Sequence, residues 1–96
     1  MSQIIFLSDI VKKTKIFNEM LESYSILVEG NIDYWNCLKM TNMILSILIE
    51  YMRIKKFAFD VYDYNLDEMN SIRMKSKFLC SILMMKMSYF RLGLNE

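Results

Sequence analysis

Carboxylates are the side chains of this sequence that are best placed to do chemistry. Asp60 precedes Asp63 by three positions, and Asp67 is followed directly by Glu68. Paired carboxylates can bind Mg²⁺ or shift each other's pKa values. However, Asp67 and Glu68 are neighbours that point to different sides of a helix, and both suit a first helical turn, where negative charge is favourable. We therefore predict no metal site and no cofactor.

Nucleophilic and imidazole chemistry is largely excluded. The sequence has no histidine, which removes Ser-His-Asp and Cys-His catalysis and imidazole ligands for zinc. Cys37 and Cys80 are isolated, and in the helices predicted below they lie roughly 10 Å apart along the axis. That separation exceeds the ~7 Å Cα limit for a disulfide, so we interpret both as small buried hydrophobes. We predict a protein without enzymatic activity.

The apolar side chains of this chain are mostly bulky. Its 96 residues, enough for one domain, include twelve Ile, eleven Leu, ten Met and six Phe, but only one Ala and three Val. A domain of this length buries only about two-thirds of the surface of its unfolded chain. The excess therefore predicts exposed apolar patches, covered by a partner or by a second copy. The composition is also typical of an AT-rich genome, viral or bacterial.

The sequence predicts a soluble protein without a membrane span. The start, "MSQIIFLSDIVKK", has no basic leader and no small-residue cleavage site, so it is not a signal peptide. The longest apolar stretch, residues 43–52, contains Glu50 and is far shorter than the roughly 20 residues that a bilayer requires. Isolated cysteines suit a reducing compartment. We expect a cytoplasmic location, or the host-cell cytoplasm if the protein is viral.

Three helices are predicted, over residues 4–28, 33–56 and 66–92. Apolar residues recur every three or four positions in each range, which indicates amphipathic helices. Gly30 and Gly93 are expected to end the first and third helices in the left-handed conformation. Asn31 or Asp33 is expected to cap the second helix, and Asn65 the third. The predicted core positions are Leu7, Ile10, Phe17, Leu21, Tyr24 and Val28, then Trp35, Leu38, Leu45, Leu48 and Met52, then Met69, Ile72, Leu79, Leu83, Met87 and Phe90.

The segment "FAFDVYDYN", residues 57–65, is ambiguous. Its alternation of apolar and polar residues resembles a strand, but a lone strand has no partner here. Its apolar spacing equally fits a continuation of the second helix. Because Asn65 predicts a new helix start, we predict a turn whose aromatic side chains plug one end of the bundle. The alternatives are a binding loop with Tyr62 and Tyr64 directed outward and, third, a strand donated to a second copy.

The predicted architecture is an all-α, up-down-up bundle completed by a second copy or a partner helix. This topology brings the basic clusters at residues 12–15, 53–56 and 73–77 to one end. A small nucleic-acid-associated regulator is therefore an alternative function, although interspersed carboxylates weaken the positive field. The residues of this alternative site are Lys12, Lys15, Arg53, Lys55, Lys56, Arg73 and Lys77.

Methionines and the middle of the second helix predict a protein-binding surface. Met84 and Met85 lie off the predicted core stripe, and flexible thioethers suit adaptable binding surfaces. The second helix is apolar on nearly every side around residues 43–52. The predicted partner-binding residues are Ile47, Tyr51, Tyr62, Tyr64, Met74, Met84, Met85 and Tyr89. We expect a homodimeric accessory or regulatory factor that binds another protein through helices 2 and 3.

Overall fold

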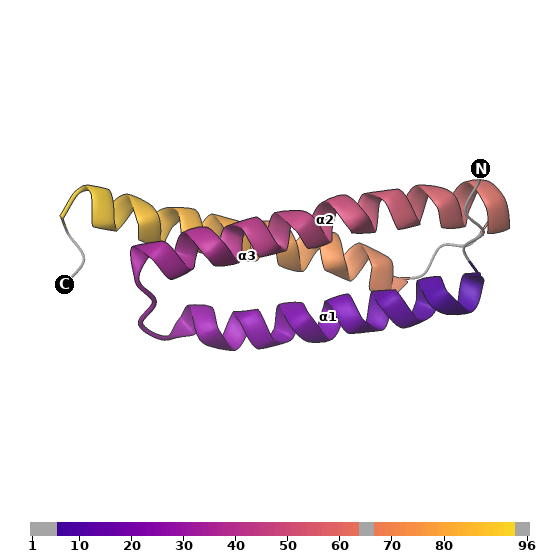
Figure 1. Ribbon diagram of the computed structural model, residues 1–96, viewed down its shortest axis with the longest axis horizontal. Helices are drawn as coiled ribbons and strands as arrows, with labels where there is room; N and C mark the ends of the chain where they lie inside the picture. Colours follow the sequence, from indigo (N-terminus) through magenta and orange to yellow (C-terminus); the bar gives the residue numbers. More distant parts are fainter. Residues whose placement is uncertain (1–5, 64–66, 94–96) are drawn as a thin grey trace.

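The computed structural model describes residues 6–63 and 67–93, and over these residues the chain forms three helices and no strand (Figure 1). These are α1 (Leu7–Glu29), α2 (Tyr34–Tyr62) and α3 (Asp67–Arg91). The start of α1, the end of α2 and the start of α3 lie at the same end of the molecule (Figure 1). The predicted all-α bundle with up-down-up order is therefore confirmed.

The helix ends are fixed by a few polar groups. The backbone N–H of Asn36 donates to Asp33 Oδ1 at 2.8 Å, so Asp33 caps α2. Gly93 has a φ of +68° and follows α3 in the predicted left-handed conformation. Gly30 does not, because its φ of −84° and ψ of −172° are extended. Instead, Lys86 Nζ from α3 donates to the carbonyls of Val28 and Gly30 at the end of α1, where positive charge is favourable.

The predicted turn over residues 57–65 is wrong for its first part, because α2 continues to Tyr62. No glycine or proline breaks the helix there, and Ala58 extends the buried stripe of α2 by one more turn. Asp63 ends the helix in the left-handed region, with φ 51° and ψ 40°. Its backbone N–H donates to the carbonyl of Phe59 at 3.0 Å. Tyr64 and the expected cap Asn65 lie outside the described residues.

The core stripes of α1 and α3 agree with the predictions. Ile10, Leu21, Tyr24 and Val28 of α1 are buried, as is Thr14, whose hydroxyl donates to the carbonyl of Ile10 at 2.8 Å. Leu7 and Phe17 are partly buried. In α3 the predicted positions from Met69 to Met87 are buried and Phe90 is partly buried.

The predicted core stripe of α2 is wrong. Trp35, Leu38, Leu45 and Met52 are exposed, and Leu48 is only partly buried. The buried residues of α2 are Cys37, Met40, Ile44, Ile47, Tyr51, Ile54 and Ala58. Both stripes follow a three-and-four spacing, but the predicted one is interrupted at Thr41, and the same side of α2 carries Asn42 and Lys56, both of which are exposed. Burial of these polar side chains without partners would destabilise the fold, whereas the observed stripe is apolar throughout.

The bundle is long and flat. Its principal extents are 49 × 25 × 14 Å and its radius of gyration is 15.7 Å, against about 12.5 Å for a compact domain of this length. Helix α3 packs against both other helices, whereas α1 and α2 contact each other least. The chain has 6933 Å² of accessible surface, against about 5,800 Å² for a typical monomer of this mass. This shape leaves much of α2 uncovered.

Within residues 6–63 and 67–93, no helix combines the length and the hydropathy needed to cross a bilayer.

Candidate functional site

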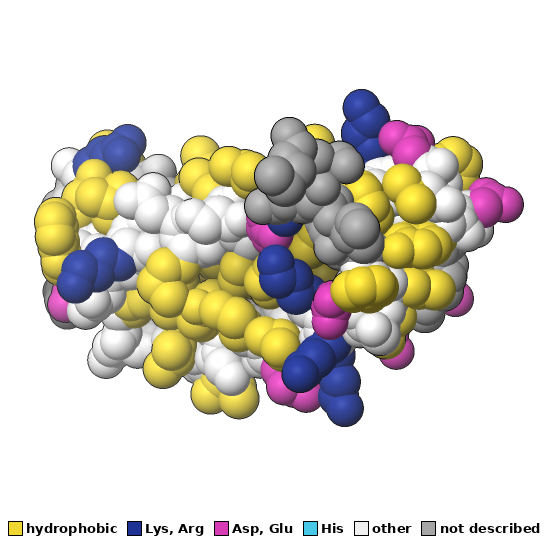
Figure 2. All heavy atoms as spheres, turned by 45° about the vertical axis from the view of Figure 1, so that its right-hand side comes forward, with side chains coloured by type: hydrophobic (Ala, Val, Ile, Leu, Met, Phe, Trp, Pro, Cys, Tyr) yellow, Lys and Arg dark blue, Asp and Glu magenta, His cyan; other side chains and the backbone are white. Residues whose placement is uncertain are grey.

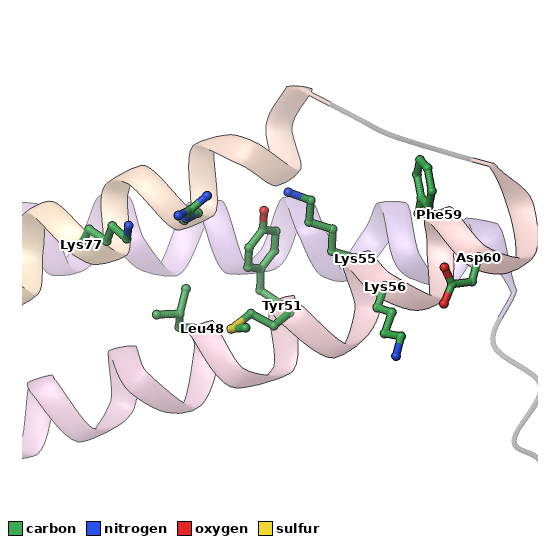
Figure 3. Close-up of a pocket in the computed structure, with 9 residues that line it drawn as sticks. Leu48, Tyr51, Lys55, Lys56, Phe59, Asp60 and Lys77 are labelled. Atoms are coloured by element: carbon green, nitrogen blue, oxygen red, sulfur yellow. The ribbon is translucent and has the colours of Figure 1, made fainter.

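A groove of about 740 Å³ runs between α2 and α3 (Figure 3). Helix α2 supplies most of its lining, and α3 supplies two cations. The groove opens on the side of the α2–α3 pair that faces away from α1 (Figure 3). Its lining residues are Leu48, Tyr51, Met52, Lys55, Lys56, Phe59, Asp60, Arg73 and Lys77.

The floor of the groove is apolar. Leu48 is partly buried, whereas Met52 and Phe59 are 62% and 61% exposed. Tyr51 is only 2% exposed, and its ring lies between α2 and α3 with the hydroxyl directed toward α3 (Figure 3). Among the described residues, nothing forms a hydrogen bond with this hydroxyl. An unpaired buried hydroxyl is uncommon and destabilising.

The rim of the groove is basic. Lys55 extends from α2 toward α3, where its Nζ lies 3.3 Å from Asn70 Oδ1 and 5.8 Å from the centroid of the Tyr51 ring. Lys56 points away from α3, so the two lysines lie on different sides of the groove (Figure 3). Arg73 and Lys77 are the cations supplied by α3, and Asp60 is the one carboxylate among the described residues of the lining.

The cations of the rim have no acidic partner within the described part of the chain, unlike three other cations of the same half of the bundle. Lys13 and Arg53 both bind Glu50, at 2.9 and 2.6 Å, and Lys75 Nζ lies 2.7 Å from Glu22 Oε1. Over residues 6–63 and 67–93, no ion pair involves the cations of the rim. Lys12 and Lys15 also have no ion pair among the described residues, but they lie on α1 outside the lining. Four cations without an acidic partner therefore line one apolar groove.

The carboxylate of Glu50 has a strongly perturbed pKa. Hydrogen bonds from Arg53 and then from Lys13 stabilise its ionised form and lower its pKa to about 2. Lys13 lies on α1 and Glu50 on α2, so this pair joins the two helices that contact each other least. Glu50 is not among the groove residues, and its role is structural.

The alternative anion site predicted from the sequence is only partly assembled. Four of its residues, Lys55, Lys56, Arg73 and Lys77, meet in the groove. Lys12 and Lys15 are exposed on α1 and are not part of its lining, and Arg53 is paired with Glu50. Of the seven cations predicted for this site, four therefore lie together along the rim of the groove and three lie outside it.

The predicted partner-binding residues are distributed over several surfaces. Ile47 and Tyr51 belong to the core, so their predicted position on an outward face is corrected. Met85 and Tyr89 line a second groove, of about 490 Å³, beside the α1–α2 connection. The other exposed members are Tyr62, Met74 and Met84, whereas Tyr64 lies outside the described residues.

A second apolar stripe follows α2 on the side away from its core, and we call it the outer seam. Its members are Trp35, Leu38, Asn42, Leu45, Ile49, Met52, Lys56 and Phe59. Steps of three and four residues relate them throughout, and all are exposed. In the view of Figure 2, hydrophobic side chains gather into bands on the molecular surface, with Lys and Arg beside them. Met52, Lys56 and Phe59 belong to both the seam and the groove.

Sequence reasoning missed the position of Leu48, Met52 and Phe59 in the lining of the groove. It placed the first two in the core and the third in an aromatic plug. The sequence does contain a usable signal. Two stripes of the same three-and-four spacing follow α2, and of these two only the observed core stripe lacks a charged or amide residue.

The two cysteines offer little nucleophilic chemistry. Burial raises the pKa of both the Cys37 and the Cys80 thiols, so little reactive thiolate exists at neutral pH. Within the described part of the chain, no three His, Cys, Asp or Glu side chains gather as a metal site would require. Comparison with protein-family models, curated proteins and solved structures found no match.

Proposed function

We propose that the protein is a non-enzymatic helical interaction module, a homodimeric accessory factor that binds another protein through exposed apolar faces of helices α2 and α3. The observation that carries this proposal is the outer seam, which gives α2 an apolar stripe on both sides. An amphipathic helix needs one such stripe to join a bundle. A second, exposed stripe of the same spacing has the pattern of a helix that pairs with a further helix.

A second copy is the occupant that we propose for the outer seam. The seam presents six large apolar side chains that are between 36% and 69% exposed. Together they offer roughly 600–700 Å² of surface, close to the ~800 Å² that each partner buries in a standard interface. Asn42 and Lys56 interrupt the seam, and single polar residues at such positions select register in paired helices. The seam therefore has both the area and the polar markers of a self-pairing helix.

Nucleic-acid binding is the second candidate, and the unpaired cations of the groove favour it. Lys and Arg side chains that neutralise phosphates supply most non-specific affinity for nucleic acid. However, the groove floor is apolar, and among the described residues of its lining Phe59 is the one exposed aromatic ring. A surface for single strands relies on several stacking aromatics. A protein partner accounts for both the floor and the rim.

Light scattering after size-exclusion chromatography tests the dimer. The wild-type chain is expected to have about twice the monomer mass at micromolar concentration. The test uses one double substitution, Trp35→Glu with Leu45→Glu, which we call the seam variant. It is expected to be monomeric with unchanged helical circular dichroism, because both side chains are exposed and paired charges would face each other across the interface.

A matched control places two Glu on another exposed apolar site. Ile26→Glu with Leu27→Glu alters side chains of α1 that are 72% and 57% exposed and is expected to leave the dimer intact. A monomeric wild type at high concentration would contradict the homodimer. A dimer lost only in the α1 control would show that a different face is used.

A further inference from the structure

We infer that the groove between α2 and α3 holds an acidic amphipathic helix of a partner protein. This inference rests on the proposed function and deepens it, because it states the chemistry of the partner. A helix laid in an apolar groove between two helices would complete a four-helix arrangement. Recognition of this kind uses apolar anchors spaced along one helical face.

The dimensions of the floor fit such a helix. Leu48 and Phe59 are eleven positions apart on α2, which corresponds to roughly 16 Å along the axis, or about three helical turns. Met52 lies between them, so the floor offers apolar contacts separated by four and seven residues. Anchors at i, i+4 and i+11 on an incoming helix have the same spacing and share one face, because eleven residues make about three helical turns.

The distribution of charge selects an acidic partner. Cations lie on both helices that border the groove, with Lys55 and Lys56 on α2 and Arg73 and Lys77 on α3. Asp60 is the opposing charge, and it lies beside Phe59 at one end of the lining (Figure 3). A helix with Glu or Asp on both flanks of its apolar stripe would meet a cation on each side. A fatty acid, with one carboxylate at one end, would leave most of the rim unpaired.

Tyr51 supplies a second, independent observation. Its hydroxyl is buried in the wall of the groove and has no hydrogen-bond partner among the described residues. Lys55 Nζ lies over the same ring, at 5.8 Å from the centroid. A carboxylate that binds Lys55 would be close enough to accept a hydrogen bond from Tyr51 once the lysine side chain adjusts. The bound state would then satisfy a group that the free protein leaves unpaired.

Fluorescence anisotropy with designed peptides tests the inference. The probe is a fluorescein-labelled helix of about 18 residues, with Leu at the i, i+4 and i+11 spacing and Glu on both flanks. The matched probe has Lys at every Glu position. We expect the wild-type chain to bind the acidic peptide at least about tenfold more tightly than the basic one, with a preference that weakens as salt is raised.

Matched variants locate the binding site. Arg73→Glu with Lys77→Glu is expected to weaken binding of the acidic peptide about tenfold or more. Lys12→Glu with Lys15→Glu changes net charge equally on α1, outside the groove, and is expected to have little effect. Tyr51→Phe is expected to weaken binding about threefold while leaving the melting temperature unchanged or higher, because it removes an unpaired buried hydroxyl.

The measurements are repeated in the seam variant, which separates this inference from the homodimer. Binding by both forms supports the groove. Binding by the seam variant alone also supports it, because a second copy would compete for Met52 and Phe59. Equal affinity for both peptides, or equal losses in the groove and α1 variants, would overturn the inference. Displacement of the acidic peptide by oligothymidylate at a lower concentration than by unlabelled peptide would also overturn it, in favour of nucleic acid.

Discussion

Glu50 joins α1 to α2, and its charge should make stability depend on pH. Its pKa is lowered from 4.5 to about 2, so the ionised form favours the folded state. This contribution is fully present above the unfolded pKa and is lost as pH falls through the folded pKa. The side chains of Lys13 and Arg53 are 50% exposed and that of Glu50 is 31% exposed, so solvent screens the ion pairs and the contribution is about 0.5–1 kcal/mol.

We predict that Glu50→Gln lowers the free energy of unfolding by about 0.5–1 kcal/mol at neutral pH. The difference from wild type should disappear between about pH 5 and pH 2. Urea unfolding followed by circular dichroism across this range measures it. Glu19→Gln serves as the control, since Glu19 is an exposed carboxylate of α1 without an ion pair among the described residues. A difference for Glu50→Gln that stays constant down to pH 2 would contradict the prediction.

Single residues were predictable from the sequence where their role is local. Asp33 and Gly93 act on the backbone within a few positions, so their effects on helix ends could be anticipated. Lys86 was missed because the carbonyls that it binds lie 58 and 56 positions earlier in the chain. Gly30 was misassigned for the same reason, since Lys86 provides the closure that a left-handed glycine would otherwise give. Long-range contacts of this kind leave no mark in local sequence.

At the scale of the element, α2 shows why periodicity alone does not identify a core face. The helix carries two stripes of equal spacing, and amphipathicity can orient a helix only when one face is clearly more apolar. The distinction depends on Asn42 and Lys56, each a single polar position within a long stripe. The same ambiguity extended to residues 57–62, where the buried stripe, rather than any local turn signal, keeps the chain helical.

Two isoleucines on α2 test which stripe is the core. Ile47 is 5% exposed and Ile49 is 69% exposed. We predict that Ile47→Ala destabilises the protein by about 2–4 kcal/mol through the cavity that it leaves. Ile49→Ala should change stability by less than about 0.5 kcal/mol, as for other surface substitutions.

Chemical denaturation measures both substitutions in the seam variant, so that loss of association does not contribute to the result for Ile49. The two changes are chemically identical, and each serves as the control for the other. Equal losses of stability would show that both sides of α2 are buried in the folded monomer, which would contradict the prediction. A larger loss at Ile49 would reverse the orientation of the helix described above.

At the scale of the whole molecule, composition was more informative than pattern. The excess of bulky apolar residues predicted exposed apolar surface before any helix was oriented, and the structure has it, with large apolar side chains exposed on all three helices. The groove itself could not be predicted, because its floor comes from α2 and its far rim from α3, and the sequence does not specify how these helices are rotated. Four of its cations were nevertheless identified as one group from topology alone.

The long, flat shape leads to a last prediction, which concerns stability and concentration. If a second copy covers the outer seam, folding is linked to association, and the melting temperature must rise with protein concentration. A tenfold increase in protein concentration stabilises the folded dimer by about 1.4 kcal/mol. This raises the melting temperature by roughly 3–6 °C for chains of this size. Differential scanning calorimetry at two concentrations measures this shift. The seam variant is expected to melt at one temperature at both concentrations, and the same behaviour in the wild type would show that α2 keeps its outer seam in contact with water.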